Sequence, residues 1–331
     1  MEYPYDVGKL HFPRDEGIHD FAHEWLYLNL HLVNLESGRK YDVMLSYFPK
    51  QELLDVPFRY FMITDRENQG YYPSMKFRFA PMNASDTKLD LKFKRGLFRG
   101  DRWLQLETKF AFEYMAIVSC QDYGLDILMR LIRPPLPVNG DGYVPVGSGG
   151  YSYYYSLTRL QVAGCITIKG EKIPVVGIGW SDHQYGDYHQ TDETETYEWF
   201  CLQLDNNVDI ICWYAYADGK LINPIMTCIL PDNKVITANT SFKIETLDYW
   251  LSPKFSKYGS KWRITEKKHK LDVIVKPVIS NQLSYVPYPF EVRGKKRFYL
   301  VGLYEGSTVI EGSFGGKPVR GVGYTELTHT R

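Results

Sequence analysis

The strongest constraint on the fold is a regular alternation of apolar and polar residues with a period of two. In the segment HEWLYLNLHL, Leu26, Leu28, Leu30 and Leu32 occupy alternate positions, and polar or aromatic residues occupy the others. This is the period of a β-strand, whose successive side chains point to opposite faces. The turn ESG leads into KYDVMLSYF, a second alternating segment, so the two segments are predicted to form a hairpin.

Comparable segments recur along the chain, many of them separated by glycine, proline or Asp/Asn residues, and no segment has a convincing helical repeat beyond a few turns. Aromatic residues make up 15% of the chain, including 27 tyrosines. This composition suits strands and aromatic-lined cavities better than long amphipathic helices. The sequence therefore predicts an all-β protein of many short antiparallel strands, a sandwich or a barrel.

Three segments occur twice in the same order, which indicates an internal duplication of one β unit. The pairs are HEWLYLNL (23–30) with YEWFCLQL (197–204), YDVMLSYF (41–48) with VDIICWYAY (208–216), and PVVGIGWSD (174–182) with PVRGVGYTE (318–326). The polar stretch YHQTDETET between the copies marks the boundary. We therefore predict two domains, residues 1–190 and 191–331, each long enough for one antiparallel barrel.

Composition excludes several classes of protein. Lys+Arg and Asp+Glu both count 39 in 331 residues, and a net charge of zero argues against a broad nucleic-acid or anionic-membrane surface. No apolar run approaches the roughly 18 residues of a transmembrane helix, and the start of the chain has no visible signal peptide. Five cysteines without metal-ligand spacing are expected to be reduced, so we predict a cytoplasmic protein.

One segment is rich in proline and glycine. RPPLPVNGDGYVPVGSGG, residues 133–150, interrupts the alternating pattern, and strand-like sequence resumes directly after it. Long irregular segments inside compact proteins are commonly lids, entrance loops or linkers. We expect a lid or an entrance here.

The two copies differ in chemistry at one place. After the shared Gly-x-Gly segment the first copy reads WSDHQYG and the second YTELTHT, so only the first pairs its acid with a histidine, Asp182–His183. This is consistent with a site in the first copy. Alternatively, Asp182 caps a turn and His183 is a satisfied residue at a strand end. Strict alternation places the two side chains on opposite faces unless a bulge intervenes.

The HEWLYLN strand offers further candidates. Its face with His23, Trp25 and Tyr27 either lines a ligand pocket or packs against the second barrel. Glu24 lies on the leucine face, where it must be paired or protonated. Candidate substrate-binding residues near an entrance or pocket are Tyr154, Tyr155, Arg159, Trp180 and Tyr185. The histidine spacing shows no metal convergence, so we predict no metal site.

The ordered segments HEWLYLN, YYYSLTR, GIGWSDHQYG, WFCLQLD, YEGSTVIEG and GVGYTELT resemble the AttH-like and carotenoid 1,2-hydratase (hydroxyneurosporene synthase) superfamily. The match runs from residue 23 to 328, nearly the whole chain. The resemblance implies two packed lipocalin-like barrels and small hydrophobic ligands. Similar folds serve hydratases of carotenoids and fungal enzymes that guide cyclisation of polyenes. The chain departs from the family pattern at Leu26, Ser181, Tyr185 and His329, which leaves a carotenoid substrate unsupported.

The leading hypothesis is an enzyme that hydrates, isomerises or cyclises a hydrophobic unsaturated small molecule, a terpenoid or polyene, without a cofactor. For hydration, Asp182 is the first candidate proton donor and Glu24 the second, and His183 or His23 would position water. Aromatic faces would stabilise the cation. The alternatives are a non-catalytic lipocalin-like carrier of a lipophilic ligand, and a surface for a protein partner.

Overall fold

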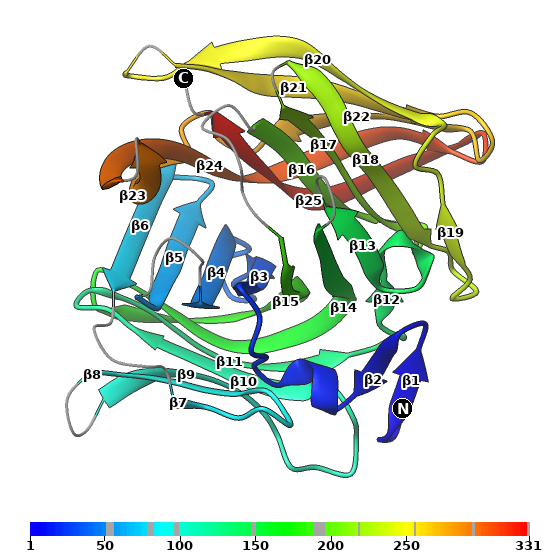
Figure 1. The fold of residues 1–331 in the computed structure, drawn as a ribbon. Coiled ribbons are helices and arrows are strands. Elements are labelled where there is room, and N and C mark those ends of the chain that lie inside the picture. Colours follow the sequence, from blue (N-terminus) through cyan, green and yellow to red (C-terminus); the bar gives the residue numbers. More distant parts are fainter. Residues whose placement is uncertain are drawn as a thin grey trace. The chain divides into compact units, whose positions relative to one another are not determined.

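The computed structural model describes residues 1–50, 56–77, 83–95, 99–146, 150–188, 196–217, 219–254, 256–292 and 295–329. They form mainly β-strands, with two 3-10 turns, η1 (Arg14–Glu16) and η2 (Val138–Gly140) (Figure 1). The chain divides into two compact units: unit 1 is Met1–Pro137, Asp141–Val144 and Tyr151–Tyr188, and unit 2 is Val138–Gly140, Pro145–Gly150 and His189–Arg331. Our predicted boundary between residues 190 and 191 falls outside the described residues.

One antiparallel sheet forms the frame of unit 1. Its strand order is β6-β5-β4-β3-β15-β14-β11-β10-β9-β8-β7, with β12 and β13 also paired to β14, and a separate hairpin of β1 and β2 precedes it. The strands are β1 (Tyr5–Val7), β2 (Leu10–Phe12), β3 (His23–Val33), β4 (Lys40–Lys50), β5 (Phe58–Asp65), β6 (Gly70–Phe77), β7 (Asn83–Ala84), β8 (Asp90–Arg95), β9 (Arg99–Gln105), β10 (Glu113–Ser119), β11 (Tyr123–Leu131), β12 (Leu136–Pro137), β13 (Tyr143–Val146), β14 (Gly150–Ile168) and β15 (Glu171–Asp187).

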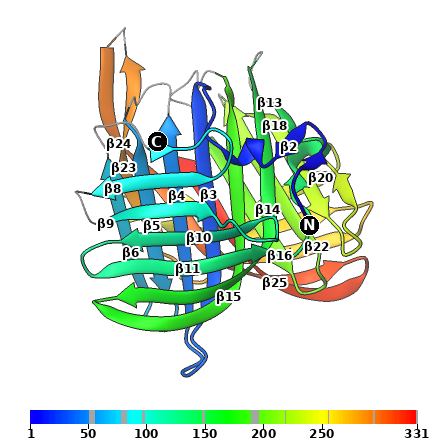
Figure 2. The same cartoon turned by 90° about the horizontal axis from the view of Figure 1, so that it is seen from below.

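This sheet curls on itself, so that β8–β11 cross the strands β3–β6 (Figure 2). Leu30, Val43 and Phe61 from one side share a single hydrophobic cluster with Trp103 and Ile127 from the other. The leucines that alternate along β3 all belong to this cluster, which explains their period of two. We call the side of the sheet that contributes to this cluster its core face.

Unit 2 repeats the design with fewer strands. Its sheet runs β19-β18-β17-β16-β25-β24-β22-β21-β20, with β23 paired to β24, and it encloses a second hydrophobic cluster. The strands are β16 (Thr196–Leu204), β17 (Asp209–Ala217), β18 (Lys220–Ile229), β19 (Val235–Thr237), β20 (Phe242–Leu251), β21 (Lys257–Glu266), β22 (Leu271–Pro277), β23 (Leu283–Val292), β24 (Lys295–Phe314) and β25 (Lys317–His329). Two curled antiparallel sheets confirm the all-β prediction.

The duplicated segments occupy equivalent places. In each sheet the Glu-Trp strand pairs with the Gly-x-Gly strand, β3 with β15 and β16 with β25. Gly177 lies opposite Leu32, whereas its counterpart Gly321 lies opposite Leu204, the counterpart of Leu30. The two copies therefore differ in register by two residues. A shift of two keeps every side chain on its original face, so both cores survive it.

The repeated glycines allow the neighbouring backbone to approach closely. A Cβ added to Gly177 would lie 2.0 Å from the His31 carbonyl oxygen, and one added to Gly321 would lie 2.5 Å from the Gln203 carbonyl oxygen. Both distances are impossible for real Cβ atoms. A glycine in a strand can leave room for a ligand or for another backbone. At these two positions the neighbouring backbone occupies the room.

The described part of the proline- and glycine-rich segment contains the short strands β12 and β13 and the turn η2. Leu136 and Pro137 pair with β14, and within unit 2 the Asn139 backbone N–H donates to the Thr227 hydroxyl at 2.9 Å. The Asn239 amide also donates to Asn139 Oδ1 at 2.7 Å. The expectation of a lid or an entrance stays a prediction, and residues 147–149 lie outside the described residues.

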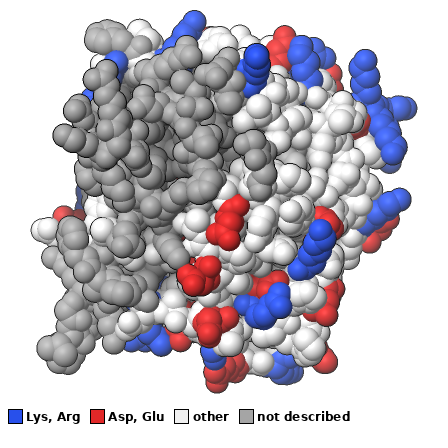
Figure 3. Space-filling view, viewed as in Figure 1, with Lys and Arg blue, Asp and Glu red and all other residues white. Residues whose placement is uncertain are grey.

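The cysteines, the absence of long apolar segments and the charge balance were also assessed from the sequence. All five cysteines are free. Among the described residues, no helix has the length and apolar character needed to cross a membrane. On the face seen in Figure 3, the visible acidic and basic side chains are interspersed, as the balanced composition suggests.

Candidate functional site

Strand β15 carries the central residues of the site, and its two neighbours determine which face each one occupies. Asp182 lies opposite Ser156 on β14 and Tyr27 on β3, whereas His183 lies opposite Tyr155 and Leu26. The pairing with β3 is uninterrupted from Val176 to Gly186. The two side chains therefore point to opposite faces, as strict alternation predicts, and no bulge interrupts the pairing of β15 with β3 at this point.

On the core face, the Glu24 carboxylate contacts two histidines. Its Oε1 atom lies 2.8 Å from His183 Nε2 and 2.9 Å from His19 Nδ1. The His19 backbone N–H also donates to the two carboxylate oxygens, at 3.2 and 3.0 Å. Glu24 is fully buried, and the expectation that a carboxylate on the leucine face needs a partner is met by these nitrogens.

Aromatic residues and an aspartate hold the two histidines in place. The Tyr155 hydroxyl lies 3.2 Å from His183 Nδ1. The Tyr185 ring stacks on His19 with 3.6 Å between ring centroids and 13° between planes. Burial lowers the pKa of His183 to about 3, so its imidazole is neutral. The Asp15 carboxylate lies 4.0 Å from His19 Nε2.

On the opposite face, Asp182 forms a second buried cluster. Trp180 Nε1 donates to Asp182 Oδ1 at 2.6 Å, and the Tyr154 hydroxyl donates to Oδ2 at 2.8 Å. Burial raises the pKa of Asp182 to about 7, although the hydrogen bonds from Tyr154 and Trp180 act in the other direction. Asp182 is thus a carboxyl group that exchanges its proton close to neutral pH, in aromatic surroundings.

Most of the remaining predicted residues lie on the face of Asp182. Trp25 and Tyr27 lie on the face of Asp182, because Trp25 pairs with Gln184 and Tyr27 with Asp182 itself. His23 lies on that face too and stacks on the Tyr188 ring with centroids 4.4 Å apart. Arg159 lies at the irregularity in the pairing of β14 with β15 and is half-buried.

Two residues of the core-face cluster were not predicted, Asp15 and His19. They come from η1 and from the segment that precedes β3, where the sequence reads RDEGIHDFAHE. The Asp15 carboxylate accepts the His11 backbone N–H at 2.8 Å and Arg14 Nε at 2.6 Å. The density of acids and histidines just before a buried strand was the available signal.

Another buried acid, Glu16, also comes from η1. Both Tyr3 and Tyr114 donate their hydroxyl protons to its carboxylate. Burial raises the pKa of Glu16 to about 7 while the two tyrosines lower it. The turn η1 therefore inserts two acids, Asp15 and Glu16, into unit 1, and each has its own set of donors.

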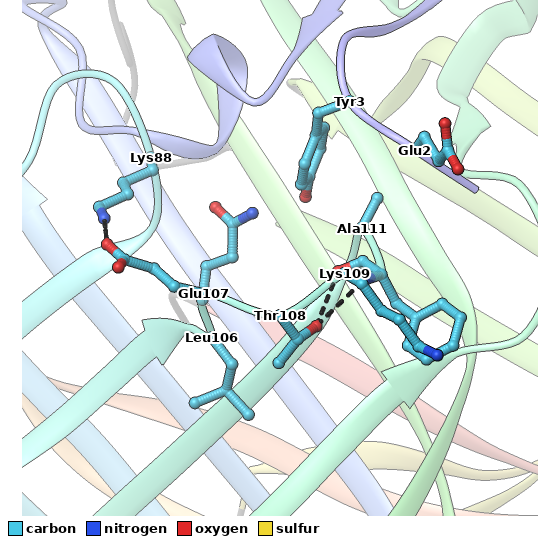
Figure 4. Close-up of a pocket in the computed structure, with 10 residues that line it drawn as sticks. Glu2, Tyr3, Lys88, Leu106, Glu107, Thr108, Lys109 and Ala111 are labelled. Carbon is cyan, nitrogen blue, oxygen red and sulfur yellow. Dashed lines mark hydrogen bonds and ion pairs between the residues drawn. The ribbon is translucent and has the colours of Figure 1, made fainter.

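A surface pocket of about 560 Å³ lies elsewhere in unit 1 (Figure 4). Polar residues dominate its lining, and Lys88 forms an ion pair with Glu107 across 2.6 Å within it. Tyr3 and Ala111 also line it. None of the predicted site residues does, so this pocket is not the aromatic-lined pocket expected from the sequence.

The cluster on the core face also has the composition of a metal site. Ligand atoms of His19, Glu24 and His183 all lie within 4.8 Å of one another. The histidines whose spacing shows no metal convergence in the sequence are His23, His31, His183 and His189, and of these only His183 belongs to this cluster. His31 instead places Nδ1 2.7 Å from Asp42, which also holds Arg66, and His189 lies outside the described residues.

Solved structures resemble this fold over nearly its whole length. A candidate AttH from Nitrosomonas europaea has a TM-score of 0.80 at 19% identity, covering 99% of both chains. Kievitone hydratase from Nectria haematococca has a TM-score of 0.75 at 15% identity, covering 99% of this chain and 97% of that one. CghA with Sch210972 has a TM-score of 0.56 at 11% identity, covering 93% and 89%.

These likenesses confirm the fold as two tandem lipocalin-like β domains. No curated protein matches the chain. The model of the AttH-like family matches residues 4–330. The resemblance noted in the sequence motifs is therefore confirmed along the chain, and this protein belongs to the AttH-like family.

Proposed function

We propose that this protein is an enzyme that adds water to a carbon–carbon double bond of a hydrophobic small molecule, with Asp182 as the proton donor. The observation that carries the proposal is the placement of one buried carboxyl group between two hydrogen-bond donors, Tyr154 and Trp180, on an aromatic face. The likeness in fold to kievitone hydratase supports the reaction class.

The reaction follows from these contacts. The Asp182 carboxyl group donates its proton to one alkene carbon, which leaves a carbocation on the other carbon and a carboxylate on the enzyme. Water attacks the cation, forming a C–O bond, and its surplus proton returns to Asp182. Tyr154 and Trp180 donate hydrogen bonds to the carboxylate, so they stabilise the ionised state formed in the first step.

Aromatic side chains suit the intermediate. A cation over the face of a tryptophan or tyrosine ring gains about 1–2 kcal/mol where water is excluded. Trp180, Tyr154 and Tyr27 are all buried beside Asp182. His23 shares this face but pairs with Gly186, about 13 Å along β15 from Asp182, so its predicted role in positioning water is not part of the proposal. His183 lies on the other face of β15, so its predicted role beside Asp182 is withdrawn.

The proposal can be tested with a panel of terpenoid, carotenoid and prenylated phenolic alkenes in H₂¹⁸O, followed by mass spectrometry. Formation of an ¹⁸O-labelled alcohol by the wild type but not by Asp182→Asn supports hydration. An isomeric product without label points to isomerisation or cyclisation instead. Retention of an unchanged alkene by the protein, without product, would identify a carrier.

A further inference from the structure

We propose that His19, Glu24 and His183 form a binding site for a divalent transition metal of the zinc type. The ligands would be His19 Nδ1, the Glu24 carboxylate and His183 Nε2. This site is separate from the proposed function, because Asp182 and its partners lie on the opposite face of the sheet. It revises our sequence-based expectation of no metal.

The three ligand atoms already converge. His183 Nε2 and His19 Nδ1 lie 2.8 and 2.9 Å from the same oxygen, Glu24 Oε1, and all ligand atoms are within 4.8 Å of one another. The His19 backbone N–H also points to that oxygen at 3.2 Å. Three nitrogens thus surround one carboxylate oxygen, and a small movement of the side chains would admit a cation between them.

The environment of His19 Nε2 favours a bound metal over a cluster held by hydrogen bonds alone. If Nδ1–H donates to Glu24 in a neutral ring, Nε2 is left as a bare acceptor. That Nε2 atom is buried and has no hydrogen-bond partner among the described residues. A metal on Nδ1 would move the proton to Nε2, which faces the Asp15 carboxylate at 4.0 Å. A carboxylate behind a histidine is the usual support of a metal ligand.

His183 is held in the same manner. With its Nε2 atom directed at Glu24, its remaining ring nitrogen lies near the Tyr155 hydroxyl at 3.2 Å. A neutral ring has one N–H, and a proton on Nδ1 can be donated to the Tyr155 hydroxyl oxygen, which leaves Nε2 free to ligate. Asp15 therefore lies behind His19, and Tyr155 lies behind His183.

Neighbouring side chains hold the three ligands close to one another in the absence of a metal. Tyr185 stacks on the His19 ring at 3.6 Å, Glu24 is fully buried, and His183 is almost so. Two imidazoles and one carboxylate suit zinc and its neighbours, whereas calcium and magnesium prefer sets of oxygen ligands. The metal would tie the segment before β3 to β3 and β15, strands that the sequence separates widely.

The test uses the purified full-length protein after EDTA treatment and dialysis. We expect Zn²⁺ titration by calorimetry to show one site with a Kd below about 1 µM, and Co²⁺ to give the visible absorption of a four- or five-coordinate nitrogen/oxygen site. His19→Asn should abolish this binding, and Asp15→Asn should weaken it about 10- to 100-fold. Circular dichroism confirms that each variant is folded.

The matched control is His11→Asn, which removes an exposed histidine of the nearby strand β2 and should leave binding unchanged. Metal binding that survives His19→Asn, binding lost in His11→Asn, or absence of a stoichiometric site would each overturn the proposal. Asp182→Asn should still bind Zn²⁺, so failure of the hydration proposal and failure of the metal proposal give different results.

Discussion

Asp182 and His183 are neighbours in the chain, yet each belongs to a different buried cluster, because β15 is paired on both sides without a bulge at this point. Asp182 accepts hydrogen bonds from Tyr154 and Trp180, whereas His183 contacts Glu24 and Tyr155. One strand thus separates a carboxyl group suited to proton donation from a histidine-rich cluster suited to binding a cation.

Asp182→Asn is expected to lower the hydration rate at least about 100-fold, because the amide cannot donate a carboxyl proton. The rate would be measured with the alkene identified in the ¹⁸O panel. Glu326→Gln is the matched control: Glu326 is the counterpart of Asp182 in unit 2 and accepts a hydrogen bond from Tyr197. An Asp182→Asn enzyme that is folded and fully active removes the proton-donor role.

Tyr154→Phe is expected to slow hydration by roughly 10- to 100-fold, since a hydrogen bond to a charged group contributes about 1.5–3 kcal/mol. The loss should fall on kcat, because the bond matters most when Asp182 is ionised. Tyr153→Phe serves as the control, as Tyr153 pairs with Tyr185 on the other face. Equal effects of the two substitutions would assign Tyr154 a structural role only.

Glu16 should make the protein less stable as pH rises. Its pKa increases from the ordinary 4.5 to about 7 on folding, so the folded state holds more protons than the unfolded state between these values. The free energy of unfolding therefore falls as pH rises through this window, by at most about 3 kcal/mol from this group.

Urea denaturation of Glu16→Gln at several pH values checks this prediction. The variant cannot ionise, so its stability should decline less between pH 4.5 and 7 than that of the wild type. Parallel curves for the two proteins would mean that Glu16 does not change its protonation on folding.

Gly177→Ala is expected to destabilise unit 1 by roughly 3 kcal/mol or more, because its Cβ would clash with the His31 carbonyl oxygen 2.0 Å away. Gly170→Ala is the comparison, since its Cβ meets open space and only the positive φ of 82° opposes the substitution. Thermal denaturation should show a clearly larger drop for Gly177→Ala. A smaller drop would mean that β3 and β15 can separate at little cost.

Much of the architecture was predictable because it depends on local patterns. The alternating leucines of β3 require a half-buried strand, and the repeated Glu-Trp and Gly-x-Gly segments require two equivalent sheets. The same alternation predicted that Asp182 and His183 point to opposite faces. These conclusions need only the period of a strand and the order of motifs along the chain.

Contacts between residues that are distant in the sequence could not be predicted from such local patterns. Glu24 and His183 are both recognisable candidates, but their contact depends on β3 pairing with β15 in one particular register. His19 and Asp15 belong to a segment without periodicity, so no local rule directs them toward these strands. The sequence alone determined the strands, their duplication and the acids and histidines available. Only the tertiary structure decided which of them meet, because strand register and the path of an irregular segment are settled by packing across the whole unit.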